Sequence, residues 1–152
     1  MNKLNKKGFT LIEVVLVLAI GGLIFLLAFL AFQQVSVNRR DTQRRSDAGR
    51  IVAELQNYQG DKGSLPSNSA TTDSCATTAA GSFGAFLSTY LCKGGEFKGP
   101  QKAYTVAVSA APGTALATDA IRYRKDSSCS GGTTGVSVEV GLEKGIACRD
   151  DQ

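Results

Sequence analysis

The sequence Gly8-Phe9-Thr10-Leu11-Ile12-Glu13 stands at the start of a long apolar segment and carries a single carboxylate, Glu13. No charged residue occurs in the run Val14–Phe32, and the next charge along the chain is Arg39. At about 1.5 Å per helical residue this run is about 28 Å long, close to the hydrocarbon thickness of a bilayer. The sequence therefore predicts a transmembrane helix over residues 14–32. A carboxylate at the edge of such a helix is costly to bury, so Glu13 indicates a function and a partner.

A short basic leader precedes this segment. It contains Lys3, Lys6 and Lys7 and no acidic residue, which is typical of the cytoplasmic flank of an exported segment. An ordinary secretory signal has a shorter apolar core, of about 7–15 residues, followed by a small-x-small cleavage site. The run here is longer, and Ala28 and Ala31 do not form that pattern. Cleavage by an ordinary signal peptidase is not expected, and an uncut signal anchor is one alternative.

The Lys-rich leader, Gly8, the residues from Phe9 to Glu13 and the apolar helix together resemble the class III signal of type IV pilins and pseudopilins. The resemblance covers roughly the first third of the chain. It implies that a membrane prepilin peptidase cuts between Gly8 and Phe9 and methylates the new amino terminus at Phe9. A glycine before the cut suits this step, because the chain can approach an active site closely without a Cβ clash.

The resemblance also implies a role for Glu13. In the family this glutamate neutralises the amino terminus of an adjacent subunit as that subunit enters the filament. Opposite charges attract strongly at low dielectric, and either one left unpaired would be costly, so the pair would favour correct register. The alternative is a chance glutamate lying in the headgroup region of an uncut anchor.

The helix is predicted to continue beyond the membrane segment as far as Gln59, since no proline interrupts it. Its second half carries apolar residues at spacings of three and four, which predicts a buried stripe of Ala48, Ile51, Val52, Leu55 and Tyr58. Gly60, Gly63 and Pro66 then end the helix. The expected domains are a cleaved leader at residues 1–8, a long helix at 9–59 and a disulfide-bonded head at 60–152.

Most of the positive charge lies in the helix. Residues 1–50 contain eight Lys and Arg against three Asp and Glu, and the whole chain has a net charge of +4. Asp41 is spaced for a helix ion pair with Arg45, and Asp47 for one with Arg44 or Arg50. The cluster is completed by Arg39 and Arg40. It allows a nucleic-acid or lipid-headgroup interpretation, but a solvated or subunit-contact face is favoured, and DNA binding by the near-neutral head is not expected.

The head is small and rich in Gly, Ser, Thr and Ala, so it needs covalent support. Cys75, Cys92, Cys129 and Cys148 all follow the membrane segment, where oxidation is expected. Four cysteines allow three pairings. Cys75–Cys92 and Cys129–Cys148 are favoured because each closes a short local loop, worth about 3 kcal/mol on the chain-entropy model. The second bridge resembles the carboxy-terminal disulfide loop of many pilins, and both a purely structural and an adhesive use of that loop are open.

Local patterns in the head predict a short helix and several strands. Phe83, Phe86, Leu87, Tyr90 and Leu91 lie on one helical face, with Ser82 as the capping residue. Alternating apolar residues predict strands around Tyr104–Val108, Ile121–Tyr123 and Val136–Leu142. Three or four strands in an antiparallel sheet would cover the amphipathic half of the helix. The expected fold class is α+β, the pilin fold: a long amino-terminal helix packed on a small antiparallel β-sheet head.

No catalytic or metal-binding motif occurs in the sequence. The chain has no histidine, no Gly-rich phosphate loop and no CxxC, so we expect no enzyme activity, no cofactor and no metal site. A monomeric membrane-anchored extracellular binding domain is the alternative of a different class.

The resemblance to the pilins implies a structural subunit of a homo-oligomeric helical filament, the type IV pilus. The subunit would be stored in the cell membrane with its head outside and then assembled into an extracellular filament by helix packing. Its partners would be prepilin peptidase and an assembly machine driven by an ATPase. Twitching motility, adhesion and DNA uptake are all functions of the family. A pseudopilin of a type II-like secretion system is the near alternative.

Overall fold

Helix α1 (Leu11–Lys62) is the first element of the computed structural model, which describes residues 8–68, 75, 79–93, 95–107 and 113–151. It ends a little beyond the predicted end at Gln59. The Gln59 carbonyl accepts a hydrogen bond from the N–H of Gly63, whose φ of 70° lies in the left-handed region that terminates many helices. By their contacts, Met1–Asn38 and Arg39–Gln152 form two units.

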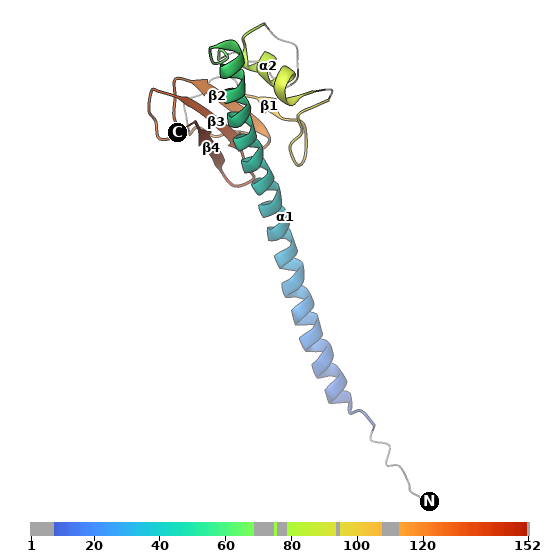
Figure 1. Cartoon of the computed structure of the whole chain (residues 1–152). Coiled ribbons are helices and arrows are strands. Elements are labelled where there is room, and N and C mark those ends of the chain that lie inside the picture. The colour runs from blue at the N-terminus through green and yellow to red at the C-terminus, as the bar shows by residue number, and fades with distance from the viewer. Residues whose placement is uncertain (1–7, 69–74, 76–78, 94, 108–112, 152) are drawn as a thin grey trace, which may run out of the picture. The chain divides into compact units, whose positions relative to one another are not determined.

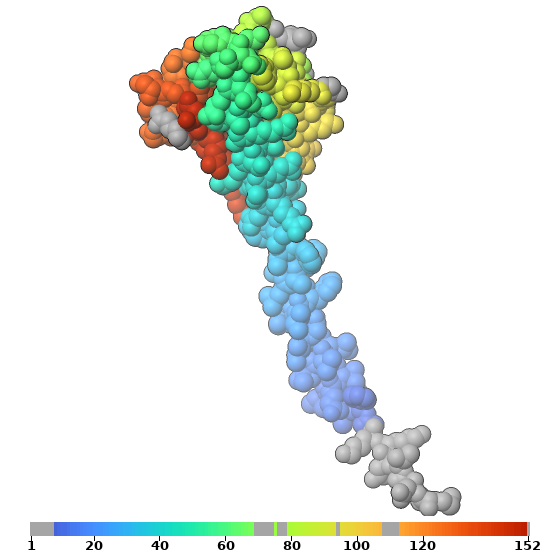
Figure 2. Space-filling model, in the orientation of Figure 1, coloured from blue at the N-terminus to red at the C-terminus, as the bar shows by residue number. Residues whose placement is uncertain are grey.

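In the first unit the apolar side chains of α1 lie on the surface. The large apolar residues from Leu11 to Val35 are all exposed, with exposed fractions between 46% and 82%, as the blue part of Figure 2 shows. By length and composition this helix can cross a membrane. A helix that is apolar on all sides requires lipid or other helices around it.

In the second unit the same helix is amphipathic and half-buried. The predicted stripe is confirmed, because Ala48, Ile51, Val52, Leu55 and Tyr58 are all buried. Figure 2 shows this end of α1, in green, between the yellow segment that contains α2 (Phe83–Phe86) and the orange to red strands. The helix therefore supplies one wall of the core.

The short predicted helix forms a second wall. α2 continues directly into a π-helical turn, η1 (Leu87–Leu91). The cap is confirmed, since the Ser82 hydroxyl accepts a hydrogen bond from the backbone N–H of Ala85 at 3.2 Å. Phe83 stacks on Tyr123 with ring centroids 4.3 Å apart, and Phe86 meets Tyr58 edge-on at 5.7 Å. These aromatic side chains are core residues.

A four-stranded sheet completes the second unit (Figure 1). Its strands lie in the order β1-β2-β3-β4, with the bounds β1 Thr105–Val106, β2 Ala120–Lys125, β3 Val136–Gly141 and β4 Ile146–Asp150. β2 pairs antiparallel with β3, and β3 with β4. Strand β4 was not among the three predicted, because its sequence has no clear apolar alternation. Val108, at the end of the first predicted strand, lies outside the described residues.

The prediction of a wholly antiparallel sheet is wrong at one edge. β1 runs parallel to β2, with Thr105 opposite Ala120 and Val106 opposite Ile121. Parallel neighbours need a crossover of about a dozen residues or more, whereas a hairpin makes antiparallel ones. The segment 107–119 between the two strands has that length. The fold class is otherwise confirmed: a long amino-terminal helix and a small mixed sheet make an α+β arrangement consistent with the pilin fold.

Candidate functional site

The Gly8–Phe9 peptide bond lies immediately before α1, in a part of the chain that is neither helix nor strand. Both residues are exposed, and the Phe9 side chain has an exposed fraction of 89%. A Cβ added at Gly8 would meet nothing within 4 Å. The fold of the described residues therefore places no demand for glycine at this position.

Glu13 lies on the first turn of α1 and closes a capping box with Thr10. Its Oε2 atom accepts hydrogen bonds from the backbone N–H of Thr10 at 2.9 Å and from the Thr10 hydroxyl at 2.8 Å. The Glu13 N–H in turn donates to the Thr10 hydroxyl at 3.4 Å. This reciprocal pairing satisfies backbone donors that the start of a helix leaves without partners. The spacing Thr-x-x-Glu is its sequence signature, and it was available in the sequence.

The capping box leaves part of the carboxylate available. Glu13 is exposed, and its Oε1 atom has no hydrogen-bond partner among the described residues. A carboxylate has about four acceptor positions on its two oxygens, so one oxygen can hold the cap while the other receives a cation. The arrangement can therefore bind an ammonium group without giving up the helix start.

A second polar cluster, in the second unit, surrounds Arg44. This side chain is fully buried, and its Nε donates to the Asp119 carboxylate at 2.7 Å. The Nη1 atom donates to Asp41 at 2.8 Å and lies 3.4 Å from Glu143, and Nη2 donates to Gln101 at 3.3 Å. Burial disfavours a charged guanidinium, but its hydrogen bonds to Asp119 and Asp41 raise the pKa of Arg44 above its ordinary value. The cluster joins α1 to three separate loops.

The ion pair predicted between Asp41 and Arg45 is wrong in its partner. Asp41 pairs with Arg44, three residues on, and not with Arg45. Burial alone would raise the pKa of the Asp41 carboxyl, but the Glu143 N–H and the Arg44 guanidinium hold it below its ordinary value. Asp47 accepts a hydrogen bond from the Tyr104 hydroxyl at 2.8 Å, and burial raises its pKa. Tertiary contacts with the Glu143 N–H and the Tyr104 hydroxyl therefore engage these two carboxylates in addition to any neighbour on the helix.

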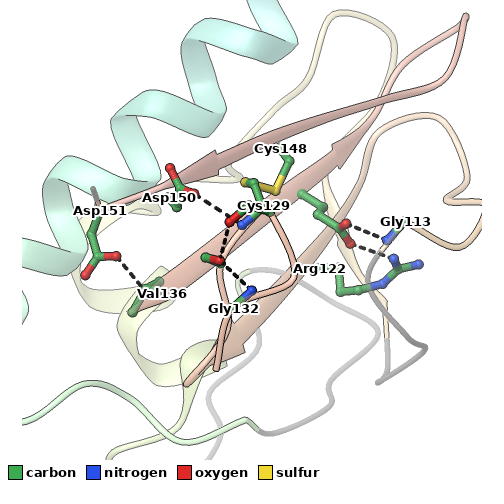
Figure 3. Close-up of a disulfide and its surroundings, with 11 residues drawn as sticks. Gly113, Arg122, Cys129, Gly132, Val136, Cys148, Asp150 and Asp151 are labelled. Atoms are coloured by element: carbon green, nitrogen blue, oxygen red, sulfur yellow. Dashed lines mark hydrogen bonds and ion pairs between the residues drawn. A yellow bond between two sulfur atoms is a disulfide. The ribbon is translucent and has the colours of Figure 1, made fainter. Parts of the chain in front are cut away.

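Both cysteine pairs that the loop lengths favoured are joined in the structure. Cys75 and Cys92 have Cα atoms 5.9 Å apart, and Cys129 and Cys148 have Cα atoms 5.8 Å apart. Figure 3 shows the second disulfide tying the loop after β2 to strand β4. The Asp150 carboxylate supports it by accepting a hydrogen bond from the Cys129 N–H at 3.2 Å.

A buried ion pair lies on the same sheet beside this disulfide. Arg122 Nη1 lies 2.6 Å from Glu139 Oε2, and the Gly113 N–H donates to the other Glu139 oxygen at 2.8 Å (Figure 3). Arg122 also donates to the Thr114 carbonyl, so the pair holds the end of the β1–β2 connection against the sheet. Glu139 is one of the residues that line the hollow beside the disulfide, and its carboxylate is already engaged by Arg122 and by the Gly113 N–H. The Arg122–Glu139 pair therefore has a structural role.

The structure thus separates the predicted residues into two groups. Gly8, Phe9 and Glu13 lie together at the start of α1, and the four cysteines form two bridges within the second unit. Sequence reasoning missed Thr10 as the partner of Glu13 and missed the partners of Arg44. Within the part of the chain that the structure describes, no group of three or more His, Cys, Asp or Glu side chains is placed to hold a metal ion.

Comparison with known proteins concerns the group formed by Gly8, Phe9 and Glu13. Residues 3–29 match a family model described as the prokaryotic N-terminal methylation motif. No curated protein and no solved structure matched the chain. The match spans the leader, the Gly8–Phe9 bond, the Thr10–Glu13 box and most of the apolar run. The motif points to a structural protein rather than an enzyme. It is the class III signal of type IV pilins and pseudopilins, and this chain carries it on an α+β fold consistent with theirs.

Proposed function

We propose that the chain is a structural subunit of a type IV pilus, cut by prepilin peptidase between Gly8 and Phe9, methylated at Phe9 and assembled into a helical filament. One observation carries the proposal: the methylation motif leads directly into an apolar helix whose side chains are exposed on every side. Such a helix is stable in lipid before assembly and among identical helices afterwards. Residues 1–8 are then the leader, and residues 60–152, which follow the predicted end of the helix at Gln59, form the head.

Assembly draws its free energy from burying this helix against other copies. The change from lipid to protein surroundings does not gain hydrophobic free energy, so close packing and polar pairing must supply much of the preference. Glu13 provides the polar part by pairing with the Phe9 ammonium of a neighbour. An ATPase-driven assembly machine would extract the subunit from the cell membrane, and the finished filament would lie outside the cell. Twitching motility, adhesion and DNA uptake are all compatible uses.

The cleavage is tested by mass spectrometry of the amino terminus in cells that contain active prepilin peptidase. We expect a chain beginning at methylated Phe9. In Gly8→Val, the added side chain should block cleavage without disturbing the fold, since a Cβ there meets nothing within 4 Å. Gly22→Ala is the matched control, because it also has free space, and it should be cleaved normally. A chain that still begins at Met1 in the unaltered protein would refute the proposal.

The charge pairing is tested separately from the cap. Glu13→Gln removes the charge but keeps an acceptor at the third helical position, which the capping box allows. We expect normal membrane insertion, normal cleavage and few or no filaments, because a neighbour's ammonium would be left without a counter-ion. Thr10→Val is the matched control: it removes the hydroxyl partner and keeps the charge, so filaments should still form. Abundant filaments from Glu13→Gln would exclude the pairing mechanism.

The abundance of the chain in sheared extracellular filaments distinguishes a pilus from a secretion pseudopilus. A pilus subunit should be recovered in long filaments. A chain retained in the cell envelope, and required for the export of a soluble protein, would instead be a pseudopilin of a type II-like system.

A further inference from the structure

The arginine cluster on α1 divides into two kinds of residue. Arg40 and Arg44 are neutralised within the second unit, by Glu143 at 2.7 Å and by Asp119 at 2.7 Å. Arg39 and Arg45 are exposed and make no ion pair with a described residue.

The carboxylates near the cluster are already occupied. Asp41 accepts hydrogen bonds from Arg44 and from the Glu143 N–H, and Asp47 accepts one from the Tyr104 hydroxyl. Neither side chain is therefore placed to neutralise Arg39 or Arg45. The predicted pair of Asp41 with Arg45 would have cancelled the Arg45 charge, but Asp41 pairs with Arg44 instead.

The sequence position of these arginines points to a membrane surface. Arg39 follows the uncharged run that ends at Phe32 and the polar, uncharged stretch Gln33–Asn38. At about 1.5 Å per residue it lies about 10 Å along the helix from Phe32, and each headgroup layer is about 5–8 Å thick. Side chains on a helix lean toward its amino terminus, and a long arginine reaches further in the same direction. Arg39 can therefore reach the phosphates. Arg45 lies about 20 Å along the helix from Phe32, which is too far from the headgroup layer for its side chain to reach them.

The placement of the two arginines around the helix favours a surrounding layer of phosphates. Residues six positions apart are separated by about 120° around a helix axis, so Arg39 and Arg45 point to different sides. A rigid DNA duplex would meet one side of the helix and contact both poorly. Headgroups surround the helix and can contact Arg39 on whichever side it lies.

We propose that Arg39 binds the phosphates of anionic phospholipids in the leaflet at the outer end of the apolar helix. Arginine suits this ligand because its planar guanidinium donates two parallel hydrogen bonds to phosphate. A basic residue at a membrane surface gives about a fivefold preference for anionic lipid. The contact holds the unassembled subunit at a defined depth and must break when the subunit leaves the membrane. It rests on the membrane-anchored state in the proposed function, and not on filament formation.

The test uses the full chain in phosphatidylcholine vesicles with a trace of spin-labelled phosphatidylglycerol or phosphatidylcholine. Electron spin resonance measures how much of each labelled lipid is immobilised by the protein, and the ratio of the two gives the selectivity. We expect Arg39→Gln to lower the phosphatidylglycerol selectivity about fivefold and Arg45→Gln to leave it unchanged, because Arg45 lies too far from the headgroups. Arg149→Gln is the matched control, because Arg149 is an exposed arginine on β4, and it should leave the selectivity unchanged. The lysines of the leader are present in every variant, so their contribution to the selectivity is the same in each and does not affect the comparison between variants.

An unchanged selectivity in Arg39→Gln would overturn the proposal. If the same variant also lost salt-dependent binding to a 30-base-pair duplex, Arg39 would be assigned to DNA instead. Because the measurement uses unassembled chains, this result leaves the filament proposal standing. That proposal fails instead on an uncut amino terminus. Both substituted arginines are exposed and without an ion pair to a described residue, so the variants should fold normally.

Discussion

The two halves of α1 have the same secondary structure and opposite surroundings. Leu23, in the first unit, has an exposed fraction of 61%, whereas Leu55, in the second, has one of 1%. Most helices in water are stabilised by tertiary packing of one face, and the second half follows this rule. The first half has an apolar surface without a protein partner among the described residues, so its helix depends on lipid or on other copies of the chain. One continuous helix therefore has a first half suited to lipid or to other helices and a second half suited to the core of the second unit.

The largest effect is expected from Arg44→Ala, because it leaves the buried Asp119 carboxylate without its main partner. Breaking a buried pair in this way costs about 3–5 kcal/mol. Arg39→Ala removes the same residue type from an exposed position and should cost less than about 0.5 kcal/mol. The free energies of unfolding of the two variants are compared by denaturant unfolding in detergent micelles, followed by near-ultraviolet circular dichroism. Three of the four tyrosines that give the signal, Tyr58, Tyr104 and Tyr123, are buried in the second unit. Equal free energies of unfolding for Arg44→Ala and Arg39→Ala would show that the Arg44 cluster does not stabilise the packing of α1 in the second unit.

The next effect compares leucines directly. Leu55→Ala empties a site in the core and should lower the free energy of unfolding of the second unit by about 2–5 kcal/mol. Leu23→Ala should leave that free energy unchanged within about 0.5 kcal/mol, since Leu23 is exposed and is not part of the core. The same unfolding measurement applies. A large loss in Leu23→Ala would mean that the two halves are not independent, which would remove the contrast between them.

Alkaline pH tests the buried phenol of Tyr104. Burial, with help from the Asp47 carboxylate, raises its pKa above the ordinary value of 10.0. The folded state therefore keeps this phenol neutral at a pH where the unfolded chain loses the proton. The resulting stability is present below about pH 10 and is lost as the pH rises further, by at most about 1.4 kcal/mol per pH unit for each such group.

The measurement is the melting temperature of the second unit between pH 9 and 11.5. Tyr104→Phe should flatten the alkaline decline, although it lowers stability at neutral pH because the hydrogen bond to Asp47 is lost. Burial also raises the pKa of Tyr123, so a smaller decline should remain in that variant. An identical alkaline decline in both proteins would contradict the assignment to Tyr104.

The smallest effect concerns the start of the first unit. Thr10→Ala removes the hydroxyl that pairs with Glu13 and should weaken the amino-terminal turn of α1 by about 1 kcal/mol. Amide exchange near Leu11 should then be several-fold faster, while exchange around Leu55 stays the same. Faster exchange in both places would show that the cap acts on the whole helix and not only on its first turn.

The features predicted correctly from the sequence depend on near neighbours along the chain. The buried stripe from Ala48 to Tyr58 follows from helical spacing, and the Ser82 cap from its place before an amphipathic turn. The cysteine pairs joined in the structure are the two that close short loops. The capping box of Thr10 and Glu13 is local in the same way, since its signature is the spacing Thr-x-x-Glu.

The features predicted wrongly depend on residues far apart in the sequence. Asp119 is 75 positions from Arg44, and Glu143 is 99 positions from it. No spacing rule connects them, so these two partners of Arg44 could not be predicted from the sequence. The parallel pairing of β1 with β2 was missed for the same reason, since strand direction depends on the path of the intervening segment.

The chain alone was enough to identify the class III signal, the apolar helix and Glu13, because a processing signal and a membrane span are properties of contiguous residues. Tertiary structure decided which charges are neutralised. It buried Arg44 against Asp119, used Asp41 and Asp47 for contacts with loops, and left Arg39 and Arg45 exposed. The physical reason is that a carboxylate pairs with the donor the fold brings nearest, and only the fold sets that distance.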